Sequence, residues 1–210
     1  MKFYLSSYKI GNNPESLASL FDINRKVAVI TNALDCYTDI LKRQNSERIQ
    51  IELLNQLGLK AELLDLRNYF GKNKELEEKL KEFGGVWVHG GNTFVLRVAY
   101  NLSSFDNIIS SYHKDTSKSD FVYAGFSSGC CVLQESLKDI DIIDEPSMTK
   151  DAYGKEPIWE GVGVLNFALV PHFESDHPES ERAGLTADYY KKNNIKYRTL
   201  KDGEVIILNN

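Results

Sequence analysis

The sequence predicts an α/β fold, in which one domain over residues 1–210 forms a mostly parallel sheet with helices on both faces. Short runs rich in β-branched and aromatic residues alternate with longer segments in which apolar residues recur at helical spacing. Strands that alternate with helices build right-handed strand–helix–strand units, and these units give a parallel sheet. A chain of 210 residues, 42% of them hydrophobic, is long enough to bury a core without covalent cross-links.

Short apolar runs are the predicted strands. They are Lys2–Leu5, Lys26–Thr31, Ala61–Leu66, Gly85–Val88, Phe121–Ala124 and Phe167–Val170. Tyr197–Leu200 and Val205–Leu208 are expected to pair as a final hairpin, for which Lys201–Glu204 supplies the turn.

Helical spacing of apolar residues marks the connections between these strands. The expected helices are a short one from Asn13 to about Phe21, followed by Asp39–Leu57, Lys74–Phe83, Asn92–Tyr100, Phe105–His113 and Ser180–Lys192. Pro14 suits the first turn of the first helix, and Gly58 ends the second. The region Asp139–Glu160 is irregular and rich in Asp, Pro and Gly, which favours a functional excursion over a domain boundary.

Charge and cysteine content limit the classes of function. The net charge of −5 and the pI of about 5.5 argue against a general nucleic-acid binder and against a basic membrane-binding face. Cys36, Cys130 and Cys131 form neither a disulfide pattern nor a zinc-binding pattern, and no motif indicates an organic cofactor. No apolar run approaches the roughly 20 residues that span a bilayer, and no signal-peptide pattern is present. We therefore expect a cytoplasmic protein, monomeric or homodimeric, without metal or cofactor.

The most informative segment is Gly125-Phe126-Ser127-Ser128-Gly129. An apolar run leads into this Gly-x-Ser-x-Gly pattern, and a run of small and apolar residues follows, which is typical of a nucleophile elbow. In such an elbow a strand turns sharply into a helix, and the strained turn leaves no room for bulky neighbours. The N-terminal amides of the helix point at the site where an oxyanion would develop. Ser127, at the centre of the pattern, is the candidate nucleophile.

Two more motifs follow predicted strands at their carboxyl ends, where ligands bind in open parallel sheets. In His89-Gly90-Gly91-Asn92, the glycines let a backbone amide approach a ligand closely, and Asn92 can cap the next helix. A plain tight turn is the alternative interpretation of these residues. His172 ends the apolar run Phe167–Val170 and is the best candidate for the base that a serine nucleophile needs.

The base in turn needs an orienting carboxylate. Several acidic residues lie between Ser127 and His172, and the chain order Ser–acid–His matches elbow hydrolases. Ile140–Asp144 alternates as an edge strand would, with Asp141 and Asp144 on opposite faces, so only one of them is expected to face the site. The residues alone do not decide between them.

With these three motifs in this order, the chain resembles the serine peptidase family that contains dipeptidase E (aspartyl dipeptidase) and cyanophycinase. The segments that carry the resemblance are Gly90–Phe94, Gly125–Gly129 and Pro171–Phe173. The alternating first half of the chain also fits the family's fold, which is like that of class I glutamine amidotransferases and belongs to the flavodoxin-like type.

The resemblance implies a hydrolase in which Ser127 attacks and His172 is general base and then acid. It implies an oxyanion hole made by the amides of Gly91 and Ser128, with Asn92 beside it at the substrate. The family's acid lies a little beyond the nucleophile, which makes Asp144 the first choice.

Asp141 and Glu145 are the next choices for the acid. Family dipeptidases cut after an N-terminal aspartate with a free amino group, which requires a cation and a carboxylate in the pocket. The segment Glu174–Arg182 is a candidate source of both, with Arg182 as the cation; a solvated helix N-terminus is the alternative for its acidic residues.

Two departures from the family pattern bear on these expectations. The family commonly has Ser-Ala-Gly where this chain has Ser127-Ser128-Gly129, and often a third glycine where this chain has His89. Three alternatives stay open. They are an esterase of the α/β-hydrolase fold, a glutamine amidotransferase domain that uses a cysteine, and a non-catalytic relative that binds a small ligand in the same cleft.

Overall fold

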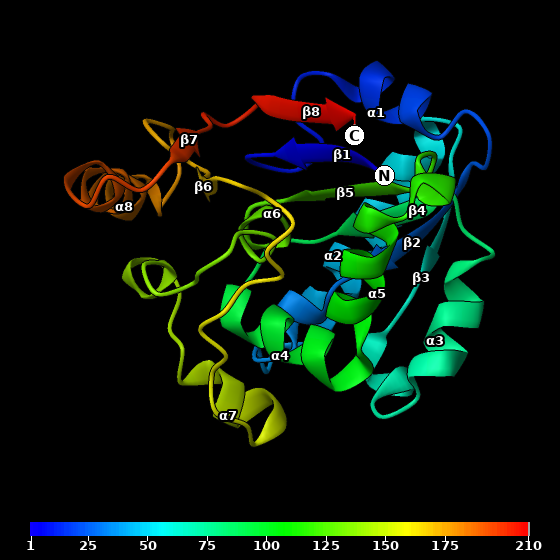
Figure 1. Cartoon of the computed structure of the whole chain (residues 1–210), viewed down its shortest axis with the longest axis horizontal. Helices are drawn as coiled ribbons and strands as arrows, with labels where there is room; N and C mark the ends of the chain where they lie inside the picture. Colours follow the sequence, from blue (N-terminus) through cyan, green and yellow to red (C-terminus); the bar gives the residue numbers. More distant parts are fainter. Residues whose placement is uncertain (210) are drawn as a thin grey trace.

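A computed structural model describes residues 1–209. Its centre is a six-stranded sheet with the strand order β3-β2-β4-β5-β1-β8 (Figure 1). The strands are β1 (Lys2–Ser6), β2 (Lys26–Ile30), β3 (Lys60–Leu63), β4 (Gly85–Val88), β5 (Val122–Phe126) and β8 (Val205–Asn209). Every pair is parallel except β1 with β8, which is antiparallel. The predicted α/β fold with a mostly parallel sheet is therefore confirmed.

Helices cover both faces of this sheet, as expected. Residues 1–209 contain the helices α1 (Pro14–Leu20), α2 (Ile40–Gln56), α3 (Asn73–Leu80), α4 (Thr93–Ser103), α5 (Phe105–Lys114), α6 (Ser128–Cys131), α7 (Met148–Tyr153) and α8 (Ser180–Lys192), of which α1 and α2 lie on one face and α3, α4 and α5 on the other. The described part of the chain also has short 3₁₀ helices at η1 (Asn32–Leu34), η2 (Leu66–Tyr69), η3 (Thr116–Lys118) and η4 (Ile140–Ile142).

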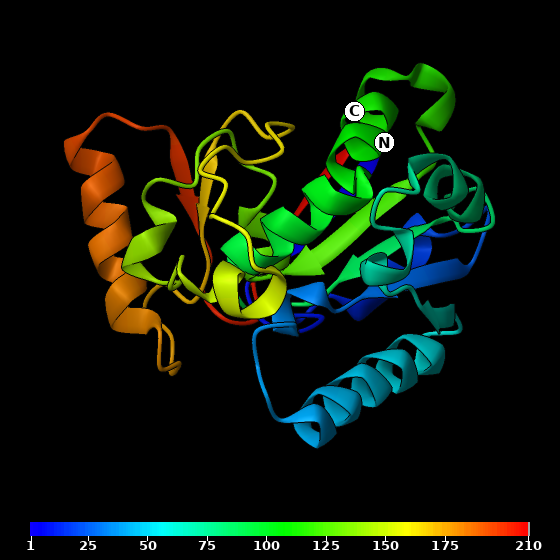
Figure 2. The same ribbon diagram turned by 90° about the horizontal axis from the view of Figure 1, so that it is seen from below.

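Alternation along the strands divides the core into two layers. Val86 and Val88 face one layer with apolar residues of α3, α4 and α5, whereas Trp87 faces the other with residues of α1 and α2. Figure 2 shows α2, in blue to cyan, and the green α4 and α5 on opposite sides of the sheet. Because successive side chains of a strand point to opposite faces, a continuous apolar strand such as β4 can bury both.

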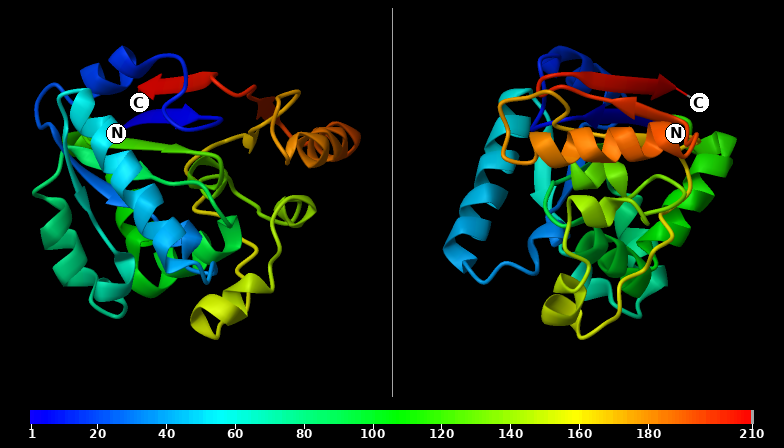
Figure 3. Two further views of the ribbon diagram at one scale, coloured as in Figure 1. Left: turned by 180° about the vertical axis from the view of Figure 1, so that it is seen from behind. Right: turned by 90° about the vertical axis from the view of Figure 1, so that its left-hand side faces the viewer.

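A small second sheet lies to one side of the central one (Figure 1). It consists of β6 (Ala168–Val170) and β7 (Tyr197–Thr199), which pair in parallel, and it packs with α8 around a cluster that contains Val170 and Tyr190. In the right-hand view of Figure 3, α8 faces the viewer and lies in front of β7. No helix within residues 1–209 is long and apolar enough to cross a membrane.

Two of the predicted elements are wrong. The expected hairpin of Tyr197–Leu200 with Val205–Leu208 does not form, because β7 pairs with β6 and β8 pairs with β1. Each strand has backbone edges that can bond to any neighbouring strand, and in the folded chain β7 lies next to β6 whereas β8 lies next to β1. The segment expected as an edge strand, Ile140–Asp144, instead begins with the 3₁₀ helix η4, whose Ile140 is buried.

Candidate active site

Ser127 lies at a sharp turn between β5 and α6. Its backbone has φ 50° and ψ −121°, a strained conformation for a residue with a side chain. The turn packs directly on β4: a Cβ atom added to Gly129 would lie 2.6 Å from the carbonyl oxygen of Val88. Glycine at this position is therefore required by close approach of the two backbones, and the segment has the geometry of a nucleophile elbow.

The second serine of the pattern does not compete for the cavity. The hydroxyl of Ser128 is buried and has no hydrogen-bond partner within residues 1–209. Cys130 and Cys131 are also buried, and burial raises the pKa of the Cys131 thiol well above its usual range. The only elbow side chain that faces the cavity with a nucleophilic atom is that of Ser127.

Ser127, His172 and Asp202 form a continuous hydrogen-bonded chain. The Oγ atom of Ser127 lies 3.1 Å from Nε2 of His172, and Nδ1 of His172 lies 2.7 Å from Oδ1 of Asp202. A carboxylate can only accept, so Nδ1 carries the proton in this pair and Nε2 is left to accept from the serine hydroxyl. This order of nucleophile, base and carboxylate is the arrangement that activates a serine.

The expected pairing of His172 with Asp144 is absent. Oδ2 of Asp144 accepts instead from the backbone amide of Thr93, at 2.8 Å, in the first turn of α4. Burial raises the pKa of Asp144 to about 6, which the hydrogen bond from Thr93 partly opposes. The two other choices are also elsewhere: Asp141 is exposed, and the Glu145 carboxylate accepts from Ser147.

Sequence reasoning missed Asp202 because it searched for the acid only between Ser127 and His172. Asp202 lies beyond the histidine, in the connection from β7 to β8 that was interpreted as a hairpin turn. The residue pair Asp202-Gly203 is equally typical of a turn. A search for acids on both sides of His172 would have included Asp202 without selecting it.

Residues far apart in the sequence hold the histidine and its acid. The backbone amide of His172, at φ 60°, donates to Oγ of Ser7, which follows β1. The same Ser7 hydroxyl lies 2.9 Å from Oδ1 of Asp202, and the amide of Asp202 donates to Oγ of Ser175 at 2.8 Å. Three segments of the fold therefore meet at Asp202.

The Gly-Gly turn after β4 lies beside the elbow. Gly91 has φ 146°, and an added Cβ atom would lie 2.6 Å from the carbonyl oxygen of Ala33. Within residues 1–209 the backbone amides of Gly91 and Ser128 donate to no protein acceptor. Free amides on both sides of a nucleophile are the groups from which an oxyanion hole is made.

Asn92 does not take the expected place beside a substrate. Its side-chain oxygen accepts from the amide of Val95 and caps α4, and its Nδ2 atom donates to the carbonyl oxygen of Glu145. The side chain is buried and does not line the cavity. Its observed contacts are structural, and they fasten the segment after η4 to the start of α4.

A cavity of about 420 Å³ opens above Ser127. The cations Lys42 and Arg43, from the first turn of α2, line it together with His89 and Glu179. Arg43 is paired with Asp35 and Glu47. The ammonium of Lys42 has no carboxylate within 4 Å in residues 1–209. Arg182 does not line the cavity, and its guanidinium donates to the carbonyl oxygen of Ile143.

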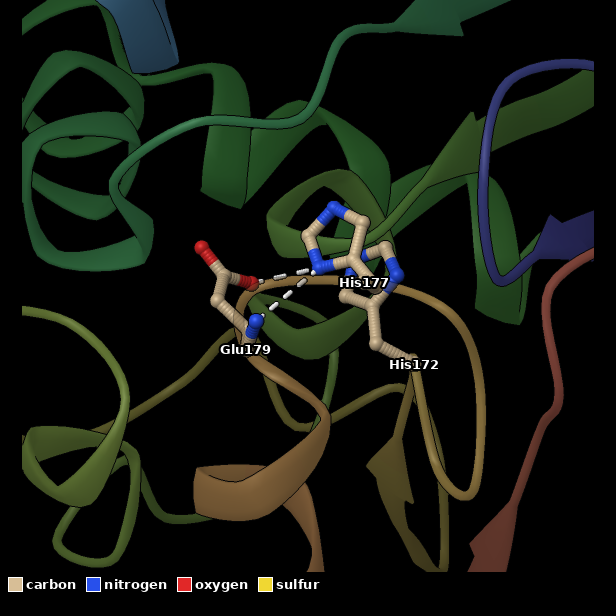
Figure 4. Close-up of side chains that lie close together, drawn as sticks. All are labelled: His172, His177 and Glu179. Carbon is tan, nitrogen blue, oxygen red and sulfur yellow. Dashed lines mark hydrogen bonds and ion pairs between the residues drawn. The ribbon is translucent and has the colours of Figure 1, made fainter.

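Aromatic rings enclose the candidate base. His172 and His177 stack with their ring centres 3.7 Å apart and their planes 8° from parallel (Figure 4). Tyr8 packs edge-on against both rings. Burial lowers the pKa of His172, although the Asp202 carboxylate opposes this shift, so the ring is neutral and able to accept a proton at pH 7.

Comparison with protein families identifies this chain. Residues 25–210 match the model of peptidase family S51. The chain belongs to peptidase family S51. The protein is therefore a peptidase of the serine-type hydrolase class, and the resemblance drawn from its three motifs is confirmed.

Solved structures agree with this family in fold. A peptidase E-type protein from Listeria monocytogenes EGD-e shares 20% identity with a TM-score of 0.67, covering 100% of this chain and 98% of its own. A peptidase from an acI-B1 Actinobacterium shares 15% identity with a TM-score of 0.67, covering 99% of this chain and 82% of its own. No curated protein matches the chain.

Proposed function

We propose that this S51 peptidase hydrolyses short peptides, in particular dipeptides with an N-terminal aspartate, through Ser127, His172 and Asp202. The observation that carries the proposal is the hydrogen-bonded chain of these three residues at the elbow, with distances of 3.1 Å and 2.7 Å. Asp202 replaces Asp144 in the role of the orienting acid.

In the first half of the reaction, Nε2 of His172 takes the hydroxyl proton of Ser127 while Oγ attacks the carbonyl carbon of the peptide. The negative charge that develops on the carbonyl oxygen is stabilised by the amides of Gly91 and Ser128. His172 then gives its proton to the leaving amine, the C–N bond breaks, and an acyl-enzyme remains on Ser127.

In the second half, water takes the place of the amine. His172 removes a proton from the water, which attacks the ester carbonyl, and the proton returns to Oγ of Ser127 as the acid product leaves. Asp202 accepts the proton on Nδ1, which fixes the tautomer of His172, and stabilises the imidazolium.

Two charged groups in the cavity support the choice of substrate. Lys42 offers a cation without a carboxylate partner in the described part of the chain, suited to the side-chain carboxylate of an aspartate. Glu179 offers a carboxylate whose Oε2 atom lies 3.8 Å from Nε2 of His172, suited to a substrate ammonium next to the scissile bond. A small ligand that carries one negative and one positive charge can pair with Lys42 and Glu179 at the same time.

The test is hydrolysis of a peptide panel by the full chain and by Ser127→Ala. The panel contains Asp-Leu, Asn-Leu, Ala-Leu and N-acetyl-Asp-Leu, together with an acyl ester. Asp-Leu is expected to be cleaved fastest. Ser127→Ala is expected to lose most of the activity and to keep only the residual catalysis that substrate binding and the oxyanion hole provide. Cleavage of the ester alone would contradict the proposal and favour an esterase.

A further inference from the structure

Three side chains of kinds that can bind metal ions lie close together in the lining of the cavity. His172, His177 and Glu179 each offer one donor atom, and the three atoms lie within 4.8 Å of one another (Figure 4). All three follow β6: His172 lies two residues after the last residue of the strand, and the other two lie in the loop that leads to α8. Two imidazoles and one glutamate are a ligand set that holds Zn²⁺ at open sites, where a water takes the fourth position.

Asp202 prepares His172 for this role as well as for catalysis. Its carboxylate accepts the Nδ1 proton at 2.7 Å, so Nε2 keeps a lone pair, which accepts from Oγ of Ser127 at 3.1 Å and which a metal ion would take instead. Metal-binding histidines commonly donate their other ring proton to a carboxylate in this way, which fixes the tautomer and raises the basicity of the ligand.

His177 also has an unprotonated ring nitrogen near the glutamate. Its Nδ1 atom accepts from the backbone amide of Glu179 at 3.2 Å, so this nitrogen is unprotonated and lies close to the glutamate. The rings of His172 and His177 are parallel without a metal, and two nitrogens of parallel rings cannot both aim at one ion. Binding therefore requires His177 to turn about its side-chain torsions, while Asp202 keeps His172 in place.

From these contacts we propose that Zn²⁺, or a metal ion with similar ligand preferences, binds to His172, His177 and Glu179 and reversibly inhibits the peptidase. Imidazole ligands favour Zn²⁺ over Mg²⁺ and Ca²⁺, which prefer sites made of oxygen atoms alone. A lone pair that is bonded to a metal cannot accept the proton of Ser127. The inhibition rests on the proposed function, whereas the binding site does not.

Binding is measured first without reference to activity. Zn²⁺ is titrated into the metal-free full chain carrying Ser127→Ala, by calorimetry at pH 7.5. One ion per chain is expected, with Mg²⁺ giving no heat at the same concentration. Absence of a stoichiometric Zn²⁺ site would overturn the proposal.

Variants then locate the ion in the same Ser127→Ala background. His177→Ala and Glu179→Gln are each expected to weaken Zn²⁺ binding by more than about tenfold, because even the hydrogen-bond partners of metal ligands commonly account for roughly 10–100-fold. His113→Ala is the matched control, since His113 packs on Phe3 away from the cavity and is expected to leave the affinity unchanged. Equal affinity in all variants would place the ion elsewhere and overturn the proposal.

The inhibition is measured last, on the chain with Ser127 intact. Hydrolysis of Asp-Leu is expected to fall over the same Zn²⁺ concentrations at which the ion binds, and to return when EDTA is added. In His177→Ala, inhibition relative to that variant's own metal-free rate is expected to need more than about tenfold more Zn²⁺. Binding without any hydrolysis of the peptide panel would leave the metal site standing and refute the proposed function, so the two failures are distinguishable.

Discussion

At the scale of single residues, two aspartates with different surroundings occupy the site region. Asp202 is partly exposed and held beside the imidazole of His172 by Ser7 and Ser175. Asp144 is half-buried, and its carboxylate binds the amide of Thr93 at the start of α4. Because their contacts differ, replacing each aspartate by asparagine is expected to have a different effect.

Asp202→Asn is expected to lower kcat about 10²–10⁴-fold, because an amide cannot hold the base in the required tautomer. Asp144→Asn is expected to keep kcat within about threefold, because its side-chain oxygen still accepts from Thr93. Rates of Asp-Leu hydrolysis for the two variants and the wild type check both statements. A large loss in Asp144→Asn with none in Asp202→Asn would reverse the assignment of the acid.

The pKa of Asp144 also predicts how stability depends on pH. Its pKa in the folded chain is about 6, above the ordinary value of 3.8. Folding therefore favours the protonated form, so the contribution of this group to stability is greatest below pH 4 and is lost as pH rises to about 6.

Melting temperatures of wild type and Asp144→Asn between pH 4 and pH 7 measure this effect. The variant cannot ionise here, so its advantage over the wild type is expected to grow across this range and to stay constant above it. If the difference in melting temperature between the two proteins does not change with pH, the raised pKa of Asp144 is refuted.

At the scale of elements, the junction of β5 with α6 depends on close contact with β4. A Cβ atom on Gly129 would lie 2.6 Å from the carbonyl oxygen of Val88 and 3.1 Å from its Cβ atom. The neighbour is backbone at the centre of the sheet, so it cannot move aside without disturbing the strand.

Gly129→Ala is expected to cost about 1–3 kcal/mol of stability and to lower kcat, since overpacking would shift Ser127. Gly184→Ala is the matched control, because Gly184 lies in α8 with nothing within 4 Å of the added Cβ atom. Alanine there is expected to stabilise the chain by about 0.5–1 kcal/mol. Urea unfolding of the two variants checks both, and equal stability of Gly129→Ala and wild type would show that the junction tolerates a side chain.

At the scale of the whole molecule, the site joins both ends of the chain. Ser7 follows β1, and Asp202 precedes β8, the antiparallel edge strand that pairs with β1 from Lys2 to Ser6. Lys2 accordingly pairs with Asn209, and β1 and β8 lie side by side in Figure 1. The position of Asp202 therefore depends on a strand pairing between residues about 200 positions apart.

A chain that ends at Glu204 lacks β8 and is expected to lose both stability and activity. The half-buried residues Val205–Leu208 would no longer cover β1, and the loop with Asp202 would have no strand to hold it. A loss above about 3 kcal/mol follows from uncovering this much apolar surface, and thermal melting measures it. A chain that ends at Leu208 keeps the strand and is the control; equal melting of both shortened chains would contradict the role of β8.

The sequence by itself determined the class of fold, the elbow serine, the histidine and the family. Each of these depends on local pattern: alternating strands and helices, Gly-x-Ser-x-Gly around Ser127, and His172 after an apolar strand. The structure keeps Ser128, Cys130 and Cys131 away from the cavity for a local reason too, since they point into the core behind the elbow.

Only the tertiary structure decided which carboxylate meets His172 and what β7 and β8 pair with. A short strand has two hydrogen-bonding edges, and its sequence does not state which distant strand will fill them. Because β7 pairs with β6 and β8 pairs with β1, the connection between β7 and β8 passes beside His172. Asp202 lies in this connection, with its Oδ1 atom 2.7 Å from Nδ1 of His172. Asp144 is nearer to Ser127 in the sequence, but its carboxylate accepts a hydrogen bond from the amide of Thr93 at the start of α4.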